Sequence, residues 1–205
     1  MAKSRARGKY AAAMHRYSGS PNVRYTDPMH IMYGLPYGGY EMNFPVYACH
    51  TAAITSGLTA NTATCVAIPL QEGMNVRRVA VMTAGAAGTP TASFVALYDT
   101  QTTPALMTGT GNLTTTAWAA NSIIIRDFQR PVTIPITGVY YVAINQAATT
   151  LSTLVGAQIV NAAHYGTVSG SPTLSFSVAV TSGTAPATLA TPTTKNVMPW
   201  VCLLG

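Results

Sequence analysis

The chain has very few charged residues. Only 8% of its 205 residues are Asp, Glu, Lys or Arg, against about a quarter in an ordinary soluble protein. Disorder does not fit, because a disordered chain combines few apolar residues with high charge, whereas 48% of these residues are hydrophobic. Long apolar runs are lacking as well, and none reaches the roughly 18 residues of a membrane-spanning helix. We therefore expect a folded protein that has no membrane partner.

Acidic residues are especially scarce, which limits the available chemistry. The chain has five, Asp27, Glu41, Glu72, Asp99 and Asp127, and all stand apart in the sequence. A hydrolase that works with paired carboxylates would have to bring two of them together. The serines form no G-x-S-x-G elbow, and the four histidines have no H-x-x-x-H spacing. We predict a protein that is not an enzyme and that uses no cofactor.

Cysteine is also rare and unpatterned. Cys49, Cys65 and Cys202 are widely spaced, with no C-x-x-C pair of the kind that binds zinc or does redox work. The N-terminus has no apolar segment typical of a secretion signal, so we interpret the cysteines as buried thiols in a reducing cytoplasm. A metal site formed by His50 with Cys49 and Cys65 is the alternative, but such a lone histidine is more often structural.

The positive charge lies mostly at the N-terminus. Six of the eleven basic residues precede the first acid, Asp27, and the rest of the chain is close to neutral. Residues 1–47 also contain seven of the eleven tyrosines and five of the nine methionines. Proline and glycine interrupt every helical or strand period in the second half of this segment. The pattern predicts an extended, largely irregular arm over residues 1–47 and a separate body over residues 48–205.

The composition of the arm is typical of a binding segment. Tyr, Met and Arg are enriched at the cores of protein interfaces, and exposed at this density they would leave a sticky surface. The arm could instead wrap its own body, or follow single-stranded nucleic acid, although the tyrosines mostly follow the charges. We predict partner binding by Lys3, Arg5, Arg7, Lys9, Tyr10, Arg16, Tyr17, Arg24, Tyr25, Tyr33, Tyr37 and Tyr40.

After the arm, the pattern is one of short strands. Runs rich in β-branched and aromatic residues alternate with turn signals, and helical period is nearly absent. The run 134–144 is the strongest, and we expect it to be the central strand of an antiparallel β-sandwich. The other predicted strands are 64–70, 76–83, 91–99, 105–108, 122–128, 132–136, 150–155, 158–160, 171–180 and 196–204.

The strand over residues 134–144 is apolar on both faces. Strand side chains alternate, and a sandwich needs only one apolar face per sheet. We therefore expect the arm, or neighbouring copies arranged about a symmetry axis, to cover the second face. The two faces are Val139, Tyr141 and Ala143 on one side and Tyr140, Val142 and Ile144 on the other.

Four segments together resemble a known family. They are VAVMTAG at 79–85, SFVALYD at 93–99, Ala117-Trp118, and VTIPITGVYYVAI at 132–144. Their order resembles the jelly-roll-type β-sandwich of virion proteins of tailed bacteriophages, which include head decoration, minor capsid, tail and fibre proteins. The resemblance covers about residues 60–156 and leaves out the arm. That family has no enzymatic residues to transfer to this chain.

The resemblance implies a minor capsid or decoration protein with a jelly-roll body. We expect its arm to bind the major capsid protein or another virion protein, and the protein to form a homo-oligomer, with a trimer favoured. Its expected location is the virion, assembled in the host cytoplasm, and nucleic acid is not an expected partner. The alternative is a tail-tip, adaptor or fibre protein whose loops 85–90 and 181–192 bind a host receptor. A lectin or carbohydrate-active enzyme is a third candidate, but carboxylates are few and Trp118 and Trp200 are the only tryptophans.

Overall fold

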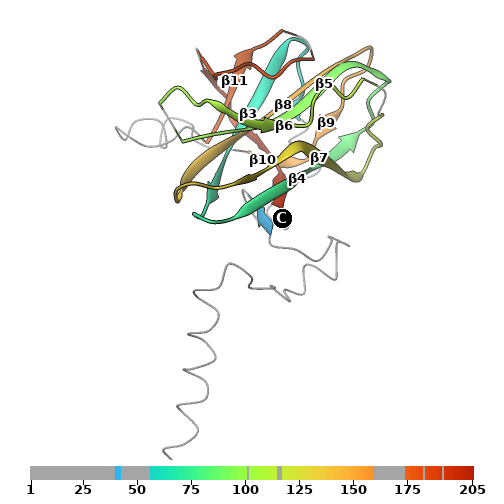
Figure 1. Ribbon diagram of the computed structural model, residues 1–205. Helices are drawn as coiled ribbons and strands as arrows, with labels where there is room; N and C mark the ends of the chain where they lie inside the picture. The colour runs from blue at the N-terminus through green and yellow to red at the C-terminus, as the bar shows by residue number, and fades with distance from the viewer. Residues whose placement is uncertain are drawn as a thin grey trace, which may run out of the picture. The chain divides into compact units, whose positions relative to one another are not determined.

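Antiparallel strands form the whole regular structure of the described part of the chain. The computed structural model describes residues 40–42, 56–100, 102–114, 117–158, 174–181, 183–190 and 192–205. Its strands form two six-stranded sheets and one two-stranded sheet (Figure 1). The prediction of an all-β, antiparallel body is confirmed, and the two large sheets are compatible with a β-sandwich.

The β8 sheet has the strand order β12-β11-β3-β8-β5-β6. Its longest strand, β8, lies between β3 and β5. Most of the run 134–144, which was predicted to be the central strand, belongs to β8 and so lies inside the sheet. The strands are β3 (Thr62–Leu70), β5 (Pro90–Tyr98), β6 (Leu106–Gly109), β8 (Gly138–Ala148), β11 (Ser175–Ala179) and β12 (Thr193–Thr194).

The β4 sheet has the order β1-β14-β4-β9-β2, with β7 on the other side of β4. A small ribbon pairs β10 with β13. The strands are β1 (Tyr40–Met42), β2 (Ser56–Gly57), β4 (Asn75–Gly85), β7 (Ser122–Thr133), β9 (Thr153–Leu154), β10 (Gly156–Gln158), β13 (Val197–Pro199) and β14 (Val201–Leu204). Three residues that the sequence analysis assigned to the arm thus belong to a sheet, because β1 pairs with β14.

Three strand pairs are nested in the sequence. β3 pairs with β8, β4 with β7, and β5 with β6. Each pair encloses the next along the chain, as in one long hairpin folded over on itself. The β3–β8 and β5–β6 pairs lie in one sheet and the β4–β7 pair in the other. The chain therefore passes from sheet to sheet along most of this region.

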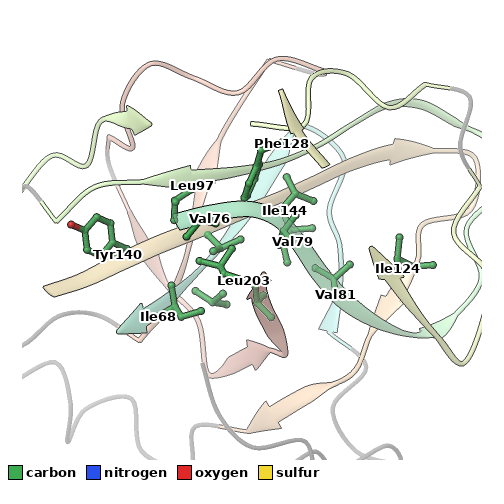
Figure 2. Close-up of a cluster of buried hydrophobic side chains, with 14 of the residues drawn as sticks. Ile68, Val76, Val79, Val81, Leu97, Ile124, Phe128, Tyr140, Ile144 and Leu203 are labelled. Atoms are coloured by element: carbon green, nitrogen blue, oxygen red, sulfur yellow. The ribbon is translucent and has the colours of Figure 1, made fainter. Parts of the chain in front are cut away.

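The two large sheets share one apolar core. Strand side chains alternate, so every second residue of a strand points toward the other sheet. In β8 these residues are Tyr140, Val142 and Ile144, all fully buried. Figure 2 shows side chains of both sheets converging there. Those labelled are Ile68, Leu97, Tyr140 and Ile144 of the β8 sheet and Val76, Val79, Val81, Ile124, Phe128 and Leu203 of the β4 sheet.

The turn before β8 explains why this strand begins later than predicted. Ile134 still pairs through its backbone, donating to Met74 O (2.8 Å) and accepting from Gly73 N (2.9 Å). The chain then bends, and the Tyr140 hydroxyl donates to Ile136 O (2.7 Å). Such a tyrosine, bonded to backbone a few residues upstream, fixes a corner between strands of a sandwich. Residues 134–137 therefore form a corner, and the strand begins at Gly138.

The second apolar face of β8 is covered in part by a segment that the sequence analysis considered only as a receptor-binding loop. Ala143 points away from the shared core and packs with Cys65, Phe94 and Tyr98 of the neighbouring strands. Leu189 and Ala185 pack on the same cluster. Residues 183–190, hereafter the strap, therefore provide part of this cover. The expected cover by the arm falls on residues outside the described ranges, and cover by neighbouring copies stays a prediction.

Candidate functional site

The predicted partner-binding residues lie almost wholly outside the described residues. Tyr40 is the exception, and its backbone pairs with Leu204 in the β1–β14 ladder. The partner-binding role of the arm remains a prediction. The structure fixes the place where the chain enters the sheet, at β1 beside the C-terminal strand.

The edge strand β7 is protected against pairing with another chain. Arg126 lies opposite Val79, a core residue, and its Nη1 donates to Ile125 O (2.8 Å). Its Nε is buried without a partner, and burial lowers the pKa of the Arg126 guanidinium. Thr108 Oγ1 also donates to Arg130 O (2.9 Å). An inward-placed charge, and carbonyls that are already bonded, discourage strand addition, so β7 is a poor docking edge.

Two of the three cysteines are buried thiols, as predicted. Cys65 and Cys202 have no exposed surface, and burial raises the pKa of the Cys65 thiol. A raised pKa lowers the thiolate fraction and with it the reactivity. Cys49 and His50, the other members of the metal site considered above, lie outside the described residues. Within the described ranges, no three His, Cys, Asp or Glu side chains come together in a group that could hold a metal ion.

The loop at residues 85–90 is fastened to the body. Ser152 Oγ donates to Gly85 O (2.8 Å), and Gln146 Oε1 accepts from Ser152 N (2.7 Å). The amide of Gly88 donates to Thr150 O (2.9 Å). Of the two loops considered as receptor-binding loops, this one is therefore held by a partly buried hydrogen-bond network. The other contains the strap.

Three hydrogen bonds hold the strap against the β8 sheet. The Tyr98 hydroxyl donates to Pro186 O (2.8 Å). The Leu106 amide donates to Ala187 O (2.8 Å), and the Leu189 amide donates to Pro104 O (2.9 Å). These bonds attach the strap to the end of β5, to the beginning of β6 and to the segment between them, at the opposite side of the sheet from β12.

Sequence analysis did not identify Tyr98 or Leu189 as important residues. One signal was present, because Phe94, Ala96 and Tyr98 alternate with Val95 and Leu97 in a strand that is apolar on both faces. The partner of the second face could not be predicted, since the strap residues Gly183 to Ala190 are mostly small and show no strand or helix period.

Comparison with known proteins does not assign the chain to a family. No family model matches the chain, and no curated protein matches it. Among the described residues there is no helix of the length and apolarity that crossing a membrane requires. Function is therefore inferred from the residues and the fold.

Proposed function

We propose that this protein is a non-enzymatic structural component of a tailed bacteriophage virion, a minor capsid or decoration protein with a jelly-roll body. The observation that carries the proposal is the nested pairing of β3 with β8, β4 with β7 and β5 with β6. This folded-over hairpin supports a jelly roll, a double-sheet fold common in viral capsid domains. It spans the residues that resemble phage virion proteins, about 60–156.

The strand order supports the same fold. In the β8 sheet the outermost nested pair, β3 and β8, lies beside the innermost pair, β5 and β6, in the order β3-β8-β5-β6. The middle pair, β4 and β7, lies in the opposite sheet. We infer a compact jelly roll, extended by the C-terminal strands β11 to β14 and by the short strands β1 and β2.

The arm provides the proposed anchor. Its basic residues would meet acidic groups of the major capsid protein, while its tyrosines would add apolar contacts with a hydrogen-bonding tip. The body has few charges of its own, so binding would depend on the arm. Homo-oligomerisation, with a trimer favoured, would place several arms on one capsid site and raise the avidity.

Capsid binding tests this proposal. Purified full-length protein is mixed with phage heads that lack it, and binding is followed by co-sedimentation. The anchor variant carries Lys3→Glu, Arg5→Glu, Arg7→Glu and Lys9→Glu. We expect it to lose at least about tenfold in affinity, since each 1.4 kcal/mol of lost interaction is a factor of ten. Binding of the unchanged protein should also weaken as salt rises, because exposed charge pairs are screened.

The matched control changes charge in the body instead. A variant with Arg77→Glu and Lys195→Glu should bind heads like the unchanged protein. Equal binding by the anchor variant and the unchanged protein would contradict anchoring by the arm. If the unchanged protein fails to bind any heads, the capsid assignment is wrong.

A further inference from the structure

One end of the shared core is polar. Thr64 of β3, Ser93 of β5 and Gln146 of β8 are all fully buried, with 0% of each residue exposed. Each lies two positions along its strand from a residue of the shared apolar core. Because strand side chains alternate, all three therefore point toward the β4 sheet. We call these three residues the polar end of the core.

The three residues are neighbours across the strands of the β8 sheet. Ser93 lies directly opposite Gln146, which places their Cβ atoms about 4.5–5.5 Å apart. Thr64 lies opposite Ile144, so it is a diagonal neighbour of Gln146, about 7–8 Å away. One small molecule between these side chains can therefore contact all three.

Each of the three side chains has a polar atom that lacks a hydrogen bond. Within the described residues, Thr64 Oγ1, Ser93 Oγ and Gln146 Nε2 are buried and have no partner. Gln146 Oε1 accepts from Ser152 N (2.7 Å), and this bond fixes which end of the amide is the oxygen. Unpaired buried polar groups cost free energy, and most such side-chain atoms in proteins do have a protein or water partner.

The chemistry of the polar end favours a neutral and very small partner. The amide nitrogen only donates, whereas each hydroxyl both donates and accepts. None of the three side chains is charged, so an ion would be buried without compensation. Ser93 is smaller than Val95 and Leu97, the inward residues that follow it in β5, which leaves room beside it. A water molecule suits such a place, because buried waters typically make two to four hydrogen bonds.

We propose that the polar end of the core binds a buried water molecule, which bridges Gln146 Nε2, Ser93 Oγ and Thr64 Oγ1 and is part of the fold. The water accepts from Nε2 and shares hydrogen bonds with the two hydroxyls. Through Gln146 it supports the fastening of loop 85–90, because Gln146 Oε1 holds Ser152 N and Ser152 Oγ donates to Gly85 O (2.8 Å). The inference concerns the body alone and does not involve the capsid.

A crystal structure of the full-length protein tests the site directly. We expect an electron-density peak for a water molecule about 2.8–3.0 Å from both Gln146 Nε2 and Ser93 Oγ. An ordered core without a peak within hydrogen-bond distance of these two atoms would overturn the inference. A direct hydrogen bond between the two side chains would overturn it as well.

The sign of a stability change is a second test, which needs no crystal. Thr64→Val keeps the shape of the side chain and removes only the hydroxyl. If that hydroxyl bonds to water, the equilibrium constant for unfolding should rise about fivefold, which is the size of one ordinary hydrogen bond. If the hydroxyl has no partner, valine removes an unsatisfied group, and the constant should stay the same or fall.

Thr83→Val is the matched control. Thr83 is also a buried threonine, but its hydroxyl donates to Ser122 O (3.0 Å), so its loss shows what one hydrogen bond contributes in this protein. Urea unfolding of the full-length variants gives both constants. We expect a rise with both variants. A rise with Thr83→Val alone would overturn the bound water, and the capsid-binding experiment would be unaffected by that result.

Discussion

The Tyr140 hydroxyl holds the corner that leads into the central strand. Its ring lies in the shared core, and its hydroxyl reaches Ile136 O at 2.7 Å. Replacing it with phenylalanine keeps the ring but removes the bond, and leaves a carbonyl without its partner. We predict that Tyr140→Phe lowers the free energy of unfolding by about 1 kcal/mol.

Urea unfolding measures this loss, and the neighbouring tyrosine serves as the control. Tyr141 points away from the shared core and is half-buried, in edge-to-face contact with Phe176. We expect Tyr141→Phe to have a smaller effect. An unchanged unfolding midpoint for Tyr140→Phe would show that the corner bond does not contribute to stability.

Two weakly acidic side chains, Cys65 and Tyr98, are buried in the cluster beneath the strap. They should make the free energy of unfolding fall at alkaline pH. Burial raises the pKa of the Cys65 thiol above its ordinary value of 9.0, and burial followed by the nearby Cys65 raises the pKa of Tyr98. In the unfolded chain both groups have ordinary values. Their contribution to stability is therefore complete below pH about 9 and is lost as the pH rises, because the unfolded state releases protons that the folded state keeps.

The expected slope above pH 9 is a loss of up to about 1.4 kcal/mol per pH unit for each group. Urea unfolding at pH 8, 9.5 and 10.5 measures it. The Cys65→Ala variant should lose stability less steeply over this range than the unchanged protein. Parallel curves for the two proteins would show that the Cys65 thiol is not responsible.

Predictions from sequence were most successful for single residues inside strands. The alternation of Tyr140, Val142 and Ile144 with Tyr141 and Ala143 was predicted and is confirmed, because it follows directly from strand geometry. The role of Tyr98 could not be predicted in the same way. Its partner, Pro186, is far away in the sequence, and no local pattern encodes that contact.

At the scale of elements, the ribbon of β10 and β13 depends on a close backbone approach. A Cβ at Gly156 would collide with the backbone carbonyl of Met198, and backbone cannot move aside as a flexible side chain can. We predict that Gly156→Ala lowers the free energy of unfolding by about 2 kcal/mol, within the range of overpacking effects.

Thermal unfolding compares this variant with a glycine that has room. At Gly109 the nearest atom to an added Cβ is the Cβ of Ala96, at 3.4 Å, which is ordinary contact. Gly109→Ala should therefore be nearly neutral. Equal melting temperatures for the two variants would contradict the close approach described for Gly156.

The strap should respond to a change at its one deeply buried large side chain. Leu189 is 3% exposed, and its replacement by alanine leaves space above the apolar face. We predict a loss of about 2 kcal/mol, at the lower end for such truncations because the strap can settle. Thr188→Ala is the control, since Thr188 is exposed.

A dye that binds apolar surface gives a second measure of this loss. Its fluorescence should rise with Leu189→Ala and stay unchanged with Thr188→Ala. If Leu189→Ala shows neither lower stability nor more dye binding, the strap does not seal this face.

The positions of most strands could be predicted, whereas their partners could not. The segments 64–70, 76–83 and 91–99 nearly match β3, β4 and β5, since β-branched runs between turn signals are a local pattern. The segments 122–128 and 132–136 were expected to be separate strands. The first and the beginning of the second form one strand, β7, because its pairing with β4 continues across an irregularity and includes both Asp127 and Val132.

At the scale of the whole molecule, the jelly-roll body and the capsid-binding arm remain a proposal. Sequence composition indicated an all-β body, which the structure confirms. It also indicated that an apolar second face needs cover, and the strap provides part of that cover. Long-range closure of this kind depends on three-dimensional packing and is not encoded in a local period. The argument for assembly therefore depends on the arm.

The location of the protein in a purified particle is the most direct test of the central proposal. If the proposal holds, phage particles that contain the chain can be purified and separated into heads and tails, and the chain quantified in each by mass spectrometry. We predict that it accompanies the heads in a fixed ratio to the major capsid protein. Its presence only in tails would contradict the capsid assignment, and its absence from particles would contradict a structural role in the virion.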